Sequence, residues 1–129
     1  MNAKKVLVVE DDLDLLRGLV IRLKASGYEV LCATDGVQAI GAARREKPDL
    51  ILLDIGLPGG DGYVVMDRLK MLIGATAPIL VLSAKDPVIH REKSHAAGAA
   101  VFLHKPVENH VLLAMVRRLL GEPTVPAHV

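Results

Sequence analysis

Five short apolar runs, separated by segments of helical length, constrain the fold of this chain more than any other feature of its sequence. Each run is three to five residues long, and several lack the alternation of apolar and polar residues that marks a half-exposed strand. Unbroken apolar strands are typical of a parallel sheet that is covered on both faces. We therefore predict five strands, at Val6–Val9, Glu29–Ala33, Leu50–Leu53, Ile79–Leu82 and Val101–Leu103.

The segments between these runs carry apolar residues at helical spacing. In the first of them, one stripe is formed by Leu15, Leu16, Leu19, Val20 and Leu23, and Ser26-Gly27 supplies a stop signal. Strict alternation of strand and helix predicts right-handed βαβ units, so the expected fold class is α/β, with a mostly parallel sheet flanked by helices. The predicted helices are Leu13–Ala25, Val37–Arg45, Tyr63–Ile73, Pro87–Ala97 and Glu108–Leu120.

Length and charge limit the domain count and the partners. At 129 residues the chain fits one compact domain, which we place at residues 1–121, with 122–129 as a disordered tail or the start of a linker. Lys and Arg number 16 and Asp and Glu 15, so no basic tail is available to bind a phosphate backbone. We therefore expect no direct nucleic acid partner.

The apolar content does not suggest a membrane or secreted protein. The apolar run near the N-terminus is too short for a signal peptide, and no stretch approaches the length of a membrane span. The single cysteine, Cys32, lies within an apolar stretch, which predicts a small buried side chain and no disulfide. These features predict a cytoplasmic protein without a membrane partner.

The predicted strands end on polar residues that would meet at one edge of the sheet. Glu10, Asp11 and Asp12 follow the first strand, Asp54 the third, Ser83 the fourth, and Lys105-Pro106 the fifth. Ligands of such sheets bind outside the carboxyl ends of the strands. Two carboxylates ~4 Å apart repel by roughly 4 kcal/mol at an effective dielectric constant of about 20, so clustered acids favour a bound cation. Oxygen ligands without His or Cys favour magnesium over zinc.

Asp54 is the candidate nucleophile at this edge. The buried strand before it holds the carboxylate in place, and Pro58 and the glycines after it let the chain turn away. A positioned carboxylate beside a metal suits the formation of an acyl phosphate. Simpler interpretations remain for single residues: Asp12 and Asp61 each precede a predicted helix and are more typical of N-caps than of metal ligands.

Together these residues resemble the receiver domain of two-component response regulators. The resemblance covers nearly the whole chain and rests on the order and spacing of four motifs, "KVLVVEDD", "LLDIGLPGGDG", "ILVLSAKD" and "GAAVFLHKP". It implies a flavodoxin-like, doubly wound fold with five strands in the order 2-1-3-4-5. It also implies that Asp54 accepts a phosphoryl group from the phosphohistidine of a sensor histidine kinase or a histidine phosphotransfer protein.

The resemblance assigns a metal site and a phosphate site. Magnesium, or manganese in its place, would bind Asp11, Glu10 through water, the Asp54 carboxylate and the backbone carbonyl of Gly56. The lifetime of the aspartyl phosphate would depend on Gly56 and Lys85.

Four further residues form the implied phosphate-binding and switch set, namely Ser83, Ala84, Phe102 and Lys105. Lys105 would pair with Asp54 and then with its phosphate, and the Lys105–Pro106 peptide bond would be cis. Phosphorylation would change the face formed by the fourth helix, the fifth strand and the fifth helix, which would act on an unidentified output partner or effector domain. For Phe102 the alternative is plain core packing.

Three other functions compete with this interpretation. A flavodoxin would need a phosphate loop where Glu10, Asp11 and Asp12 stand, and these acids would repel a phosphate. A phosphatase of the haloacid dehalogenase type would resemble this chain, but it would need a second aspartate where Gly56 stands. A pseudo-receiver would bind a partner without phosphorylation. The favoured prediction is a signalling phosphoacceptor, not an enzyme, whose only activities are self-phosphorylation and autodephosphorylation.

Overall fold

A computed structural model describes residues 3–57, 62–73 and 77–123 of the chain. Within these residues, all five apolar runs form strands, each within two residues of its predicted bounds. The turn residue Pro58 and the predicted N-cap Asp61 lie outside the described residues. The strands are β1 (Lys5–Val9), β2 (Glu29–Ala33), β3 (Leu50–Leu53), β4 (Ile79–Ser83) and β5 (Val101–His104).

The helices begin where polar side chains satisfy free backbone N–H groups. The Asp12 carboxylate accepts hydrogen bonds from the N–H groups of Asp14 and Leu15, which confirms its interpretation as an N-cap. Asp35 and Asp86 cap the second and fourth helices in the same way. The helices are α1 (Leu13–Ala25), α2 (Gly36–Glu46), α3 (Gly62–Ile73), α4 (Pro87–Ala96) and α5 (Asn109–Leu119).

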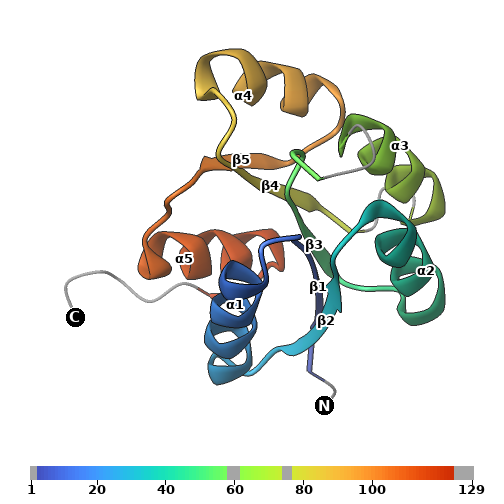
Figure 1. Cartoon of the computed structure of the whole chain (residues 1–129). Helices are drawn as coiled ribbons and strands as arrows, with labels where there is room; N and C mark the ends of the chain where they lie inside the picture. Colours follow the sequence, from blue (N-terminus) through green and yellow to red (C-terminus); the bar gives the residue numbers. More distant parts are fainter. Residues whose placement is uncertain (1–2, 58–61, 74–76, 124–129) are drawn as a thin grey trace.

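The strands form one parallel sheet in the order β2-β1-β3-β4-β5, which confirms the predicted doubly wound topology (Figure 1). Its register pairs Val9 with Leu53 and Ser83 with His104. Because all strands run in one direction, the residues that follow them collect at the same edge.

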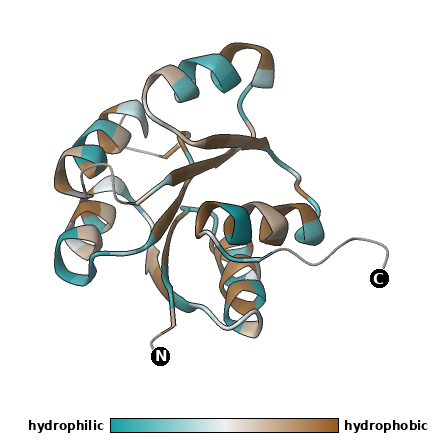
Figure 2. Cartoon of the chain, turned by 180° about the vertical axis from the view of Figure 1, so that it is seen from behind, coloured by the Kyte–Doolittle hydropathy of each residue, from teal (hydrophilic) through white to brown (hydrophobic). Residues whose placement is uncertain are grey.

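Helices cover both faces of the sheet (Figure 1). One core lies between the sheet and α2 and α3, and it contains Met66 and Leu69. The other lies between the sheet and α1 and α5, and it contains Leu19 and Leu112. The strands are hydrophobic along most of their length, whereas the helices carry both hydrophilic and hydrophobic residues (Figure 2). Burial on both faces fixes the central strands and the residues at their ends.

Gly62 allows the start of α3 to lie against the segment after β3. A Cβ atom at this position would collide with the backbone of Ile55, which is itself buried. The sequence therefore requires glycine here for close packing.

The interpretation of Cys32 as a buried side chain is wrong, since Cys32 is exposed. The strand that carries it, β2, is an edge strand with a neighbour on one side only, and Glu29 on the same strand is exposed too. Apolar neighbours in sequence therefore do not guarantee burial on an edge strand.

None of the helices in the described part of the chain is long and apolar enough to span a membrane. The carboxylate of Glu122, beyond the end of α5, accepts a hydrogen bond of 2.5 Å from the hydroxyl of Tyr28. Residues 124–129 lie outside the described residues.

Candidate functional site

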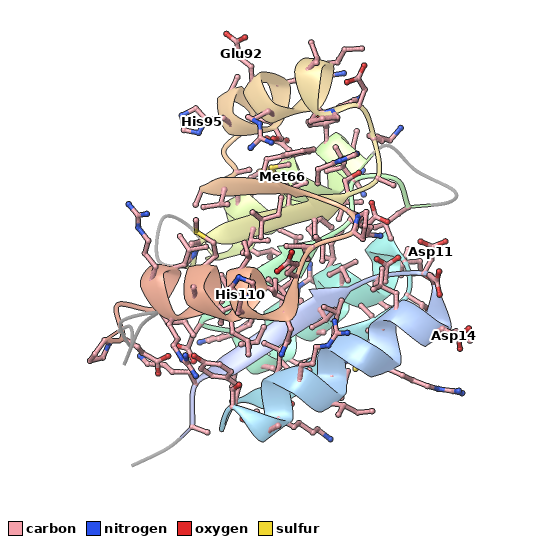
Figure 3. The ribbon with its side chains drawn as sticks, turned by 90° about the vertical axis from the view of Figure 1, so that its left-hand side faces the viewer. Asp11, Asp14, Met66, Glu92, His95 and His110 are labelled. Carbon is pink, nitrogen blue, oxygen red and sulfur yellow. The ribbon has the colours of Figure 1, made fainter. Side chains whose placement is uncertain are left out.

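The carboxyl ends of β1 and β3 bring three acids together. One carboxylate oxygen from each of Glu10, Asp11 and Asp54 lies within 4.8 Å of the others. Glu10 is 2% exposed and Asp54 is 9% exposed, whereas Asp11 is exposed beside the start of α1 (Figure 3). The cluster therefore combines two restrained carboxylates with one that faces solvent.

Lys105 joins this cluster from the end of β5. Its Nζ atom lies 2.5 Å from Glu10 Oε1 and 3.1 Å from Asp54 Oδ2. Its backbone N–H donates to the carbonyl of Ser83 at 2.9 Å, which fixes its position relative to β4. The Lys105–Pro106 peptide bond is cis, the form expected for it.

The second oxygen of Asp54 is also held. Asp54 Oδ1 accepts a hydrogen bond of 2.8 Å from the N–H of Gly56. A Cβ atom on Gly56 would lie 3.3 Å from that oxygen and 3.6 Å from Cε of Lys85. Both candidate lifetime positions therefore lie beside the Asp54 carboxylate, and glycine leaves this side of it uncovered.

Burial and pairing shift two protonation equilibria in the site. Burial raises the pKa of Glu10, although hydrogen bonds from Lys105 and from the Asp12 N–H oppose this shift. Burial also lowers the pKa of Lys105, but its bonds to Glu10 and Asp54 outweigh that effect, so the net pKa is raised. Lys105 thus stays cationic beside the acids.

Hydrogen bonds fix the loop that follows β4. Ser83 is fully buried, and its hydroxyl oxygen accepts a hydrogen bond of 3.1 Å from the N–H of Lys85. The carbonyl of Ala84 lies 3.3 Å from Nε2 of His104, which donates to it. The peptide group between Ala84 and Lys85 is therefore held at both its oxygen and its nitrogen.

Phe102 lies on β5, which β4 separates from the strand that leads to Asp54, and its side chain belongs to the core on the α2 and α3 face. It is 4% exposed and pairs with Val81 in the register of β4 and β5. The guanidinium carbon of Arg91 lies 5.3 Å from the centre of its ring. Phe102 therefore connects the strand that carries Lys105 with α4.

The donor set fits a divalent magnesium ion. Three ionised carboxylates and one ammonium leave a net charge of about −2, which a divalent cation neutralises. All the ligand atoms are hard oxygens, and two of the carboxylates are held in place. The chemistry of the site therefore suits the metal that the sequence suggested.

Sequence reasoning missed the contact between Lys105 and Glu10, because it paired Lys105 with Asp54 alone. The two residues lie 95 positions apart, and no local pattern connects them. Sequence reasoning also missed the contacts that Arg91 makes with Phe102 and that His104 makes with Ala84. An arginine and a histidine on an exposed helix and strand end are common in any chain, so only the packing of α4 and β5 identifies their partners.

Comparison with known proteins places these features in a family context. The family model described as "Response regulator receiver domain" matches residues 6–117. The transcriptional regulatory protein PrrA of Mycobacterium tuberculosis strain H37Rv is 40% identical over 120 residues, a match that covers 93% of this chain and 51% of PrrA. The chain thus spans about half the length of the curated relatives it matches.

Solved structures agree with this match. A CheY-like receiver domain protein from Methanospirillum hungatei JF-1 superposes with a TM-score of 0.87 at 26% identity, covering 93% of this chain and 95% of that one. The receiver domain of the sensor histidine kinase PA1611 from Pseudomonas aeruginosa PAO1 gives a TM-score of 0.84 at 30% identity, covering 94% and 100%. That structure has a magnesium ion coordinated in its active site cleft.

Proposed function

This chain belongs to the response regulator receiver family, and on that basis we propose that Asp54 is its phosphoacceptor. The phosphoryl donor is the phosphohistidine of a sensor histidine kinase or of a histidine phosphotransfer protein. Receiver domains are signalling phosphoacceptors, so the expected output is a change of partner binding and not a released product.

The observation that carries this proposal is the fixed geometry of the Asp54 carboxylate. One oxygen accepts from Gly56 N–H and the other pairs with Lys105, while Glu10 and Asp11 supply further oxygens nearby. A carboxylate restrained in this way needs little reorganisation before it attacks.

The proposed reaction transfers a phosphoryl group from a histidine nitrogen to a carboxylate oxygen of Asp54. A carboxylate oxygen of Asp54 attacks the phosphorus atom, and an O–P bond forms while the P–N bond of the phosphohistidine breaks. The imidazole of the donor leaves with the electron pair of that bond and takes up a proton. Hydrolysis of the aspartyl phosphate by water later restores the carboxylate and releases inorganic phosphate.

Magnesium would be held by four groups: Asp11, Asp54, the Gly56 carbonyl, and Glu10 through a water molecule. Manganese, which carries the same charge, could take its place. When bound, the metal neutralises negative charge on the transferring phosphoryl oxygens. Lys105 would then pair with a phosphoryl oxygen. The Ser83 hydroxyl and the backbone N–H of Ala84 would donate to the others.

Phosphorylation of Asp54 would also change parts of the molecule outside the site. A phosphoryl group adds about 1.5 to 2 negative charges and new acceptor oxygens, which draw Ser83 and Lys105 toward Asp54. Because Ser83 ends β4 and Lys105 directly follows β5, the change would reach Phe102 and the face formed by α4, β5 and α5. The output partner, or an effector domain joined to the chain, would recognise that face.

The test is labelling with acetyl phosphate, with and without magnesium, followed by intact mass. We expect one phosphoryl adduct that requires magnesium and disappears with time. Asp54→Ala should abolish it, whereas Asp14→Asn, which changes an exposed acid on α1, should leave it unchanged. An absent adduct despite intact magnesium binding would contradict the proposal and support a pseudo-receiver, a protein-interaction module independent of phosphorylation.

A further inference from the structure

Helix α4 is attached to the molecule differently from the other helices. Its only buried residue is Ser94, and its apolar residues Val88 and Ile89 are 87% and 59% exposed. By contrast, α1 buries three leucines against the sheet. Hydrophobic burial therefore contributes little to the position of α4, and polar contacts must hold it.

Arg91 joins α4 to β5 through two contacts with one residue, Phe102. Its Nη1 atom donates a hydrogen bond of 3.1 Å to the backbone carbonyl of Phe102, and its guanidinium carbon lies 5.3 Å from the ring centre. The hydrogen bond satisfies a carbonyl on an edge strand, and the stacking adds a cation–π attraction. A planar guanidinium can make both contacts at once.

The space beside Arg91 is not completely filled by side chains. A hollow of about 260 Å³ lies between α4 and β5, and its lining includes Arg91, Ser94, His95 and Phe102. On the other side of α4, the Nδ1 atom of His90 lies 2.6 Å from the hydroxyl of Tyr63 in α3. Two adjacent residues thus attach α4 to its two neighbours through polar groups.

A short segment connects these attachments to the Asp54 site. The N–H of Lys85 donates to the Ser83 hydroxyl, and Asp86 then caps α4. On the neighbouring strand, Phe102 lies two positions before His104, the register partner of Ser83. Any movement of Ser83 toward Asp54 that breaks its bond with Lys85 would therefore shift the start of α4 relative to Phe102.

We propose that Arg91 is a positioning residue that opposes phosphorylation of Asp54. By binding Phe102, it holds α4 in the arrangement in which Lys85 N–H binds the Ser83 hydroxyl. This inference rests on the proposed function, because it assumes that Ser83 turns to a phosphoryl oxygen. A contact made in only one of two arrangements shifts their equilibrium by its own free energy, so removing it favours the other arrangement.

The expected effect is measurable with beryllofluoride, a phosphoryl analogue, added together with magnesium. Arg91→Ala should bind it about 3- to 10-fold more tightly than the wild type, the size expected for one surface cation–π contact and one hydrogen bond. Labelling by acetyl phosphate should become faster by a similar factor. Arg91→Lys keeps the charge without the planar fork, and it should fall between the two.

The chain offers both a specific probe and a matched control. Phe102 is the only phenylalanine, so fluorophenylalanine labelling gives one ¹⁹F resonance that reports on this ring. Arg91→Ala should move that resonance toward its position in the beryllofluoride complex, before any ligand is added. Glu92→Ala removes an exposed side chain that points away from the sheet on the same helix, and it should behave as wild type (Figure 3).

The outcomes separate the two proposals. If the wild type binds beryllofluoride and Arg91→Ala binds it equally or more weakly, the role of Arg91 is overturned while the proposed function stands. If the wild type shows no magnesium-dependent binding, the proposed function falls, and the role of Arg91 falls with it. Thermal unfolding of each variant establishes that it is folded. If Arg91→Ala does not fold, the comparison of Arg91→Lys with the wild type provides the test.

Discussion

At the scale of single residues, Lys105 connects the charges of the candidate site. It is the cation that pairs with both Glu10 and Asp54, and its side chain is only 16% exposed. A partly buried pair is costly to break on one side, because the remaining charge loses its partner. The lysine and a divalent metal thus neutralise the same acids.

Replacing Lys105 by Gln should therefore destabilise the metal-free protein and strengthen metal binding. We expect a loss of about 2 kcal/mol in the free energy of unfolding without magnesium, and a smaller loss at saturating magnesium. Urea unfolding at the two magnesium concentrations measures both values. Equal losses in the two conditions would show that Lys105 does not act on the acids through its charge.

Two glycines should respond to alanine with opposite signs. Gly62→Ala places a Cβ atom on the backbone of Ile55, which cannot move aside, so we expect a loss of about 3 kcal/mol. Gly18→Ala, within α1, meets nothing within 4 Å and should gain about 0.8 kcal/mol from helix propensity. Urea unfolding of both variants tests the pair, and a neutral Gly62→Ala would contradict the close approach.

Single residues also show what sequence patterns can and cannot predict. The cap formed by Asp12 was predictable, because capping depends on the next few residues along the chain. The exposure of Cys32 was not, because it depends on how far the helices cover each residue of the edge strand β2. The pairing of Lys105 with Glu10 was missed because three-dimensional packing determines it.

At the scale of helices and strands, α4 differs from the rest of the molecule. The strands and the other helices follow from apolar periodicity, so their bounds were predictable within two residues. The bounds of α4 were predictable too, from Pro87 and its cap. Its attachment was not, because it depends on the polar contacts of His90 and Arg91, whose directions only the assembled fold defines.

Tyr63→Phe should loosen α4 without affecting the helices on the opposite face. The substitution removes the hydroxyl that lies 2.6 Å from His90 and leaves the stacked ring. We expect a local loss of about 1 kcal/mol, which corresponds to roughly fivefold faster amide hydrogen exchange in α4. Exchange in α1 and α5 provides the internal control, and uniform acceleration across all helices would refute a local role.

At the scale of the whole molecule, Tyr28 joins the chain before β2 to the chain after α5. Its hydroxyl donates to Glu122, 94 positions away. Burial, and then this carboxylate, raise the pKa of Tyr28 from 10.0 to about 12. Because the folded-state pKa is above the unfolded value, neutral Tyr28 stabilises the fold below pH 10, and that contribution disappears as the pH rises through about 12.

An absorbance titration of tyrosinate in the Tyr63→Phe variant isolates this group, since the chain has only two tyrosines and no tryptophan. We expect a midpoint near pH 12. Glu122→Gln should lower it, although burial should keep it above 10.0. A midpoint at the ordinary value would show that the link between the two ends of the fold is absent in solution.

The order of the strands along the chain has a consequence for how the fold forms over time. Glu10, Asp11 and Asp54 can meet once β1 and β3 have paired, but Lys105 follows β5, which comes after both of those strands along the chain. A partly folded chain therefore carries acids in mutual repulsion, without their ammonium partner. Salt or magnesium should shorten the life of that intermediate stage, and refolding rates measured at several ionic strengths would show it as faster folding at higher salt.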